Sequence, residues 1–350
     1  MHQNINNQNT TTMKTRKLRD LEVSAIGMGC MGFTHAYGEG PSEQEGIRLV
    51  RLAFDLGCNF FDTAEMYSYF ENEEFVGKAL KQLPRDKVII SDKFWPEKLP
   101  GHDFAEDKLS EEGIRKALEG QLRRLGTDYI DLYTEHQMRE GNEEEVAFVM
   151  GELIKEGKIR AWGQSSPTAE QIRKAHAVTP ITAVQSEYSM MARQWESDVL
   201  PLCRELGIGF VAFSPMANGF LSGKYNAGTE FKGDDLRTVI TRFSKENMNR
   251  NQPLIDLINR YATEKQCTPA QISLAWDMMA YESLVPIPGM RREERVRENL
   301  GAAEVELTKD EYNALTAELN RLTVYGDRSG LNKLASVPES TKDQGEVYKK

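Results

Sequence analysis

Cysteines are few in this sequence, and long apolar runs are absent. Cys30, Cys58, Cys203 and Cys267 occur in 350 residues without forming a Cys-x-x-Cys pair, which argues against a disulfide scaffold and favours a reduced, cytoplasmic protein. No run of about 18 apolar residues occurs, so no transmembrane helix is predicted. The five histidines are dispersed, and none lies at zinc-site spacing to a cysteine, so no metal site is predicted.

Positive charge is also in short supply. The chain carries 44 Lys and Arg against 54 Asp and Glu, a net charge of -10. An acidic chain is a poor candidate for binding nucleic acid or an anionic membrane, so a local basic cluster must hold any phosphate-bearing ligand. With 39% hydrophobic and 28% charged residues, the composition is that of an ordinary globular protein.

The two ends of the chain differ from the part between them. Residues 1–12 are rich in Asn, Gln and Thr and lack the apolar stretch of a signal peptide, so we expect a flexible leader; Met13, where the patterned sequence begins, is an alternative start. Residues 323–350 are expected to form a polar C-terminal tail. No low-complexity linker divides residues 13–322, which are therefore predicted to form one barrel domain.

Short apolar segments alternate with helical repeats along this domain. Such runs predict strands that are buried on both faces, and glycines such as Gly126 and Gly207 are expected to end the intervening helices. The expected strands are Ala25–Cys30, Asn59–Ala64, Val88–Phe94, Ile130–His136, Ile159–Ser166, Ala183–Ser189, Gly209–Pro215 and Leu284–Gly289.

Eight strand–helix units in regular alternation predict an α/β protein of the (β/α)8 TIM-barrel type. A barrel needs about 250 residues, so some of this chain must lie outside it. The excess predicts an N-terminal β-hairpin within residues 13–26, a long loop after strand seven (216–251), and an extra C-terminal helix, Asp310–Leu322, before the tail.

One motif suggests a different fold and is rejected. Residues 27–32 (GMGCMG) match the G-x-G-x-x-G pattern of Rossmann dinucleotide-binding loops. In a Rossmann fold that loop opens directly into a helix, but here residues 33–41 include Gly38, Gly40 and Pro41 and predict a loop. The glycines are instead expected to let backbone and ligand come close at the mouth of the first strand.

Four polar residues lie at the ends of three expected strands. Barrel enzymes place catalytic residues there, and these ends carry Asp62, Tyr67, Lys93 and His136. Taken singly, they could be a helix cap, a loop aromatic, a solvated charge and a buried core histidine. Together they suit the reduction of a carbonyl group, because the alkoxide left by hydride attack needs a proton that a tyrosine can donate.

Lys93 and Asp62 have defined roles in this hypothesis. A nearby ammonium stabilises the phenolate and lowers the tyrosine pKa from its ordinary value of about 10, so Lys93 is expected to lower the pKa of Tyr67. Asp62 would keep Lys93 charged and oriented, and His136 would hydrogen-bond and polarise the substrate oxygen.

These residues lie in stretches that resemble the aldo-keto reductase family. The resemblance runs in order from near residue 20 to about residue 322 and includes DTAEMY (62–67), SDKFW (91–95), LGTDYIDLYTEH (125–136) and AFSPMANGFLSGK (212–224). It implies the catalytic tetrad Asp62, Tyr67, Lys93 and His136, with NADP(H) extended across the barrel mouth. The chain departs from commoner members at Ser68, at Gln137-Met138 and at Asn218, which stands where an Arg is expected.

The resemblance also implies where the cofactor binds. Ser165, Ser166 and Gln185 would hold the nicotinamide amide, and Phe213 would stack on its ring. The cofactor-binding residues implied in all are Met31, Asp62, Ser165, Ser166, Gln185, Phe213, Ser214, Met216, Asn218, Lys224, Gly289, Arg291, Arg295, Glu298 and Asn299.

An arginine cluster favours NADP over NAD. Arg291, Arg292 and Arg295 crowd the start of a predicted helix, where guanidinium groups and the helix N-terminus both suit a phosphate. The alternative is an ordinary solvated helix face on which Glu293 and Glu294 neutralise the arginines.

An apolar pocket is expected beside the tetrad. Its proposed wall, which favours a hydrophobic or aromatic aldehyde or ketone, consists of Met31, Phe33, Tyr37, Phe94 and Trp95. The main hypothesis is therefore an NADPH-dependent carbonyl reductase acting on a small molecule. The alternatives are a cofactor-sensing binding module resembling potassium-channel β-subunits, and a dedicated reductase of a sugar or pyridoxal-like aldehyde. The oligomeric state is left open.

Overall fold

The computed structural model describes residues 13–97 and 107–329, and the statements below concern these ranges. The predicted leader, 1–12, and residues 330–350 of the predicted tail lie outside them.

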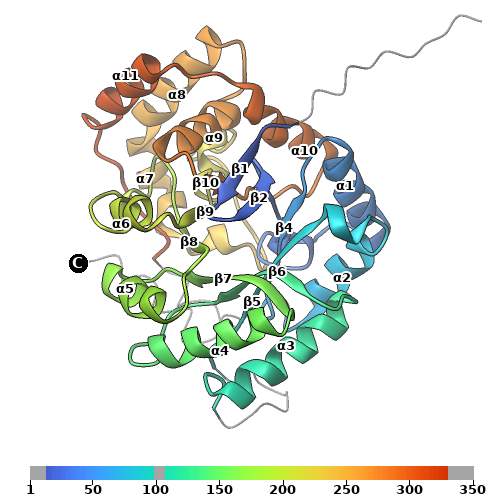
Figure 1. The fold of residues 1–350 in the computed structure, drawn as a ribbon. Helices are drawn as coiled ribbons and strands as arrows, with labels where there is room; N and C mark the ends of the chain where they lie inside the picture. The colour runs from blue at the N-terminus through green and yellow to red at the C-terminus, as the bar shows by residue number, and fades with distance from the viewer. Residues whose placement is uncertain (1–12, 98–106, 330–350) are drawn as a thin grey trace, which may run out of the picture.

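A parallel barrel forms the centre of the molecule (Figure 1). Within the described residues, eight strands pair in chain order, each with the next, which confirms the predicted TIM barrel. All lie inside the segments expected from the sequence. They are β3 (Met28–Gly29), β4 (Phe60–Asp62), β5 (Ile89–Phe94), β6 (Ile130–Glu135), β7 (Ile159–Ser165), β8 (Ala183–Glu187), β9 (Gly209–Phe213) and β10 (Leu284–Pro286).

Helices surround the barrel (Figure 1). The helices between successive strands are α1 (Glu43–Asp55), α2 (Glu71–Leu80), α3 (Glu111–Leu125), α4 (Glu143–Lys155), α5 (Ala169–Val178) and α6 (Val199–Leu206). After β9 and β10 follow α7 (Lys245–Arg250), α8 (Gln252–Glu264), α9 (Pro269–Ala280), α10 (Glu293–Leu300) and α11 (Lys309–Leu319). The extra C-terminal helix therefore exists but ends before the predicted Leu322.

Local sequence signals fix many helix ends. The Thr268 hydroxyl accepts a hydrogen bond from the Gln271 backbone, and Pro269 takes the first helical position of α9, as helix N-termini prefer. Gly126 and Gly207 end α3 and α6 in the left-handed conformation, which costs glycine little because it has no Cβ.

The barrel closes where β3 meets the segment after β10. Gly29 forms a parallel bridge with Gly289, and its N–H donates to the Pro288 carbonyl at 3.1 Å. A Cβ on Gly29 would lie 2.7 Å from the Ile287 carbonyl oxygen. This glycine of the GMGCMG segment therefore lets a neighbouring backbone come close, and it also lines the cavity at the mouth of the barrel. The next helix begins only at Glu43, which agrees with the rejection of a Rossmann loop.

A hairpin covers the N-terminal end of the barrel. It consists of β1 (Thr15–Leu18) and β2 (Leu21–Ser24), as predicted, and in Figure 1 it crosses the centre of the ring of strands. Leu18, Leu21 and Val23 belong to an apolar cluster with inward-facing side chains such as Phe60 and Ile89. A second, larger cluster lies between the strands and the helices. The hairpin thus plugs the inner core and leaves the opposite end open.

The long loop after β9, residues 216–251, is held partly by the C-terminal segment. The Asn251 amide donates to the Tyr325 carbonyl at 2.8 Å, and the Asp327 N–H donates to the Thr241 hydroxyl at 3.0 Å. The described part of the expected tail, 323–329, therefore lies against this loop.

None of the helices in the described ranges has the length and apolar composition that crossing a bilayer requires.

Candidate active site

A cavity of about 440 Å³ opens at the carboxyl ends of the barrel strands. Its lining includes Asp62 and Tyr67 beside β4, His136 after β6, and Arg291 and Arg295 after β10. Because β6 and β10 are four strands apart in the eight-stranded order, His136 and the arginines lie on opposite sides of the mouth. The cavity therefore connects two chemically different regions, one with the tetrad and one with a cluster of positive charge.

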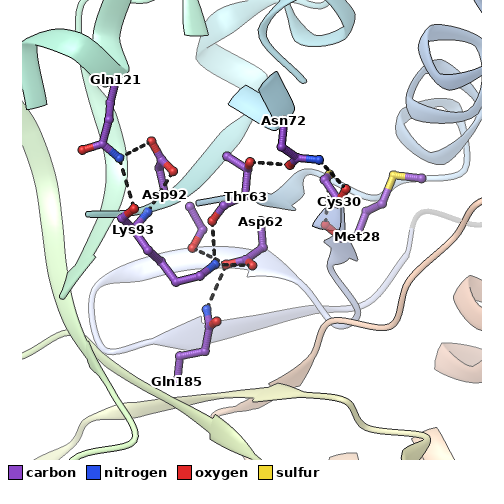
Figure 2. A network of polar contacts seen from close by, with 10 residues as sticks. Met28, Cys30, Asp62, Thr63, Asn72, Asp92, Lys93, Gln121 and Gln185 are labelled. Atoms are coloured by element: carbon purple, nitrogen blue, oxygen red, sulfur yellow. Dashed lines mark hydrogen bonds and ion pairs between the residues drawn. The ribbon is translucent and has the colours of Figure 1, made fainter. Parts of the chain in front are cut away.

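A buried ion pair lies at the floor of this cavity. The Lys93 ammonium is 2.6 Å from Asp62 Oδ1 and donates to the Thr63 carbonyl at 2.5 Å. Figure 2 shows the ammonium between these two acceptors. The other carboxylate oxygen accepts from Ser91 and from Gln185, each at 2.8 Å. Asp62 is thus fixed by neighbours on β5 and β8 as well as by the lysine.

Strand alternation explains how Lys93 comes to face inward. Successive side chains of a strand point to opposite faces, and on β5 Ile89 joins the inner cluster while Ser91 and Lys93 reach Asp62. Asp92 points the other way and accepts from the Gln121 amide on α3 at 2.7 Å, as Figure 2 shows. Burial by itself lowers the pKa of Lys93, but the charge and hydrogen bond of Asp62, together with the neighbouring Tyr67, outweigh it and raise that pKa overall. The side chain therefore stays cationic.

Tyr67 lies in the turn between β4 and α2. Its side chain is 9% exposed, and the Lys93 ammonium lies 5.1 Å from the ring centroid. Burial raises the pKa of Tyr67, and Lys93 opposes this rise without cancelling it. Lys93 therefore lowers the pKa of Tyr67 as expected, but the pKa is still raised overall, because the desolvation of a buried phenolate is the larger effect. The hydroxyl stays protonated at neutral pH.

His136 follows β6 and faces Tyr67. The two rings meet edge-on with centroids 5.8 Å apart, and the Trp95 ring also meets the imidazole edge-on, with centroids 5.1 Å apart. Burial, helped by the charges of Lys93 and Arg328, lowers the pKa of His136 well below its ordinary value. The ring is therefore neutral at neutral pH. Its buried Nδ1 has no hydrogen-bond partner within the described residues.

The cavity brings together most of the expected cofactor residues. Four expected residues do not line it: Ser166, Lys224, Glu298 and Asn299. Those that do line it are Met31, Asp62, Ser165, Gln185, Phe213, Ser214, Met216, Asn218, Gly289, Arg291 and Arg295.

Acidic residues neutralise part of the arginine cluster. Arg295 pairs with Glu298 within α10, and Lys224 lies 4.0 Å from the same carboxylate. Arg292 is 3.9 Å from Glu294, while Arg291 donates to the Gly38 carbonyl at 3.3 Å. Both expectations for this cluster are therefore partly met: it faces the cavity, and glutamates also lie within it.

Three residues of the expected substrate wall, Phe33, Phe94 and Trp95, do not line the cavity. Phe94 faces away from the barrel axis, with its ring 5.2 Å from Tyr133, because the next position along β5 from inward-facing Lys93 must point outward. Phe33 packs against Phe75 of α2 at 5.3 Å. Trp95 lies behind His136 instead of lining the cavity. Of the five expected wall residues, Met31 and Tyr37 line it.

Comparison with known proteins identifies the family of this chain. The model of the Aldo/keto reductase family matches residues 25–320. A probable aldo-keto reductase from Glycine max is 41% identical over 312 residues, which cover 88% of each chain. The chain belongs to the aldo-keto reductase family.

Solved structures resemble this aldo-keto reductase over nearly its whole length. A glycerol dehydrogenase from Gluconobacter oxydans has a TM-score of 0.80 and 27% identity, with coverage of 91% of this chain and 98% of that one. An aldo-keto reductase from Klebsiella pneumoniae, in complex with NADPH, has a TM-score of 0.69 and 26% identity, with coverage of 89% and 100%.

Two departures of this aldo-keto reductase from commoner family motifs make specific contacts. Asn218 adopts a left-handed conformation with φ 58° and donates to the Tyr37 hydroxyl at 2.9 Å, so it joins the loop after β9 to the loop after β3. The Ser68 hydroxyl donates to Thr34 Oγ1 at 2.9 Å. Both contacts tie loops together at the cavity mouth.

Sequence reasoning missed several charged residues that support the reductase site. Glu65 accepts from the backbone N–H of Trp95 at 2.7 Å and pairs with Lys108 at 3.0 Å, both side chains being 1% exposed. Arg242 of the long loop pairs with Glu187 at the end of β8 at 2.8 Å. Glu65 lies inside the DTAEMY motif, so its position at a strand end was a usable signal. Lys108 and Arg242 come from distant loops, and no local sequence signal pointed to them.

Proposed function

We propose that this chain catalyses the NADPH-dependent reduction of an aldehyde or ketone to an alcohol, with Tyr67 as the proton donor. Membership of the family makes the chain an oxidoreductase. The observation that carries the finer proposal is the buried ion pair of Lys93 and Asp62 at 2.6 Å, placed beneath the Tyr67 ring in a cavity that His136 also lines. A cation buried at this cost is retained where a negative charge develops during the reaction.

The residues present fit NADP(H). Ser165 and Gln185 line the cavity at the ends of β7 and β8, where their polar side chains suit a carboxamide. Arg291 and Arg292 line the opposite side of the cavity and suit phosphate oxygens, since a guanidinium matches their geometry. Bound NADPH would supply the hydride that reduces the carbonyl carbon.

Each tetrad residue then has a distinct task. Tyr67, protonated at neutral pH because burial raises its pKa, donates its hydroxyl proton to the substrate oxygen. The Lys93 ammonium stabilises the phenolate that remains, and Asp62 holds the ammonium in place. Neutral His136 has one ring N–H, which can donate a hydrogen bond to the substrate oxygen and polarise the carbonyl. A free proton then returns to Tyr67 from solvent.

The substrate is proposed to be a small carbonyl compound handled in the cytoplasm. Met31 and Tyr37 provide apolar surface at the cavity, which suits an aromatic or aliphatic aldehyde or ketone. All four cysteines are free thiols, as is usual for proteins of reducing compartments.

The decisive experiment compares the wild type with Tyr67→Phe. NADPH consumption is followed with a panel of aromatic and aliphatic aldehydes, and NADPH binding is measured separately by fluorescence. Loss of the proton donor is expected to lower kcat by about 10²–10⁴-fold while leaving the dissociation constant of NADPH within about twofold.

Two outcomes would contradict the proposal. Undiminished turnover in Tyr67→Phe would show that another group donates the proton. Tight NADPH binding without turnover of any aldehyde by the wild type would favour the cofactor-sensing module instead.

A further inference from the structure

The turn that follows Tyr67 has a strained backbone. The three residues directly after the tyrosine, Ser68, Tyr69 and Phe70, have φ values of 49°, 46° and 82°. Residues with a Cβ rarely adopt this left-handed region, because it brings the Cβ close to a backbone carbonyl oxygen. Three such residues in succession keep their conformation only where the surrounding structure holds them. The backbone next to the proposed proton donor therefore depends on contacts from outside the turn.

Asn72, in the first turn of α2, is the buried side chain that supplies these contacts. Its amide nitrogen donates to the Cys30 carbonyl at 3.1 Å and to the Thr34 hydroxyl at 2.9 Å. The same hydroxyl oxygen accepts from Ser68 at 2.9 Å. The backbone N–H of Asn72 donates to the Tyr67 carbonyl at 3.4 Å. Asn72 therefore reaches the turn directly at Tyr67 and, through Thr34, at Ser68.

The side-chain oxygen of Asn72 leads to the buried ion pair. It accepts from the Thr63 hydroxyl at 2.7 Å, and the Thr63 carbonyl accepts from the Lys93 ammonium at 2.5 Å. Figure 2 shows both contacts, with Thr63 joining Asn72 to the lysine. Both N–H groups and the oxygen of the side-chain amide are thus in use. One amide links the turn that carries Tyr67 to the residue that holds the cation beside it.

We propose that Asn72 is a positioning residue, which fixes the Tyr67 hydroxyl relative to the Lys93 ammonium. The inference rests on the proposed function and adds to it a residue that does not line the cavity. A proton donor must lie within hydrogen-bond distance of the substrate oxygen and near the cation that stabilises its phenolate, so a small displacement slows the reaction. Without Asn72, the strained turn is expected to relax and to carry Tyr67 away from Lys93.

Asn72→Leu tests this role, because leucine has a similar shape and no hydrogen-bonding group. NADPH consumption is followed with 4-nitrobenzaldehyde. We expect kcat to fall by about 10–100-fold, as a small misplacement of a reacting group implies. The dissociation constant of NADPH, measured by fluorescence, should stay within about twofold. The solvent deuterium isotope effect on kcat should rise, because proton transfer from Tyr67 becomes slower relative to the other steps.

Asn59→Leu is the matched control, since it makes the same substitution at the opposite end of the barrel. The Asn59 side-chain oxygen accepts from the backbone N–H of Ser24 at 2.7 Å, so its loss should also lower the free energy of unfolding. Its kcat and its solvent isotope effect should nevertheless match those of the wild type.

Thr34→Val keeps the inference testable if Asn72→Leu does not fold. Thr34 is half-buried, and valine keeps its shape while removing the hydroxyl that contacts Asn72 and Ser68. We expect kcat to fall by roughly threefold to tenfold, as the loss of one or two hydrogen bonds implies. The solvent isotope effect should rise here too.

Hydrogen exchange tests the turn without turnover. The backbone amides of residues 67–72 should exchange faster in Asn72→Leu than in the wild type and at the wild-type rate in Asn59→Leu. Equal exchange in Asn72→Leu and the wild type would overturn the inference. A fall in kcat that merely matches a fall in the number of NADPH sites, with an unchanged isotope effect, would also overturn it. If the wild type reduces no aldehyde, the proposed function is overturned, and faster exchange in Asn72→Leu would still support Asn72 as the residue that holds the turn.

Discussion

The two ends of the barrel use the same strands for opposite purposes. On β4, Phe60 faces the apolar plug formed by the hairpin, and Asp62, two residues later, faces the cavity. On β5 the inward side chains change from Ile89 to Ser91 and then to Lys93. The N-terminal end excludes water and stabilises the fold by apolar packing. The mouth instead buries charged side chains, which a folded protein tolerates only when they are paired. On β4, a residue that stabilises the fold and a residue of the candidate site are therefore only two positions apart.

The largest effect should follow from breaking the ion pair at the mouth. Lys93→Met leaves Asp62 buried without its cation, which costs about 3–5 kcal/mol of unfolding free energy and removes the group that stabilises the Tyr67 phenolate. We expect kcat to fall by about 10²–10⁴-fold. Urea unfolding and NADPH consumption measure the two effects.

A double variant separates these two losses. Asp62→Asn/Lys93→Met removes both charges and should recover most of the lost stability, because replacing a whole buried pair is often nearly neutral. Its activity should remain as low as that of Lys93→Met. If the double variant is no more stable than Lys93→Met, the stability lost in Lys93→Met does not come from the unpaired charge of Asp62.

A substitution at the hairpin end of the barrel should change stability without changing activity. Leu18 is fully buried in the hairpin, and Leu18→Ala is expected to lower the free energy of unfolding by about 2–5 kcal/mol. Its kcat should stay within about twofold, because the mouth is untouched. Val178→Ala, at a 43% exposed position on α5, is the control and should change stability by less than about 0.5 kcal/mol. A large loss of kcat in folded Leu18→Ala would show that the two ends are coupled.

A smaller effect should make the carboxyl end of β6, and not the plug, sensitive to pH. Glu135 ends β6 beside His136, and burial raises its pKa to about 8; its carboxylate oxygens have no hydrogen-bond partner in the described part of the chain. Since the folded state then binds the proton more tightly than the unfolded state, the contribution of Glu135 to stability is complete below pH 4.5. It is lost as pH rises to about 8.

Glu135→Gln tests this pH dependence directly. The variant should be more stable than the wild type at pH 8, by a few kcal/mol at most, and the difference should shrink toward pH 5. Thermal melts at both pH values measure it. Glu119→Gln, at an exposed position of α3, should show no pH-dependent difference. A constant offset at both pH values would assign the effect to packing instead of ionisation.

Much of the fold was predictable because its signals are local. The eight strands, the hairpin and the cap at Thr268 follow from apolar runs and turn residues that lie next to one another in sequence. The Lys93–Asp62 pair was also expected, since both residues end neighbouring parallel strands. The outward direction of Phe94 was also predictable, because Phe94 follows inward-facing Lys93 on the same strand.

Other features depend on approaches between distant segments. Glu65 meets Lys108, which lies 43 positions away, and Arg242 reaches Glu187 across 55 positions. Phe33 lies against α2 and not at the cavity because of how the loop after β3 folds back. No local pattern encodes such contacts, because they exist only once the barrel has closed and the loops have settled on one another.

The sequence by itself determined the barrel, the order of its strands and the residue types at their carboxyl ends, because periodicity and turn chemistry act over a few residues. The tertiary structure alone decided that burial outweighs Lys93 in raising the pKa of Tyr67, and that His136 is neutral. It also decided that Arg328 stands over Phe213. These properties depend on how much water and which charges surround each group, and only the assembled mouth of the barrel sets both.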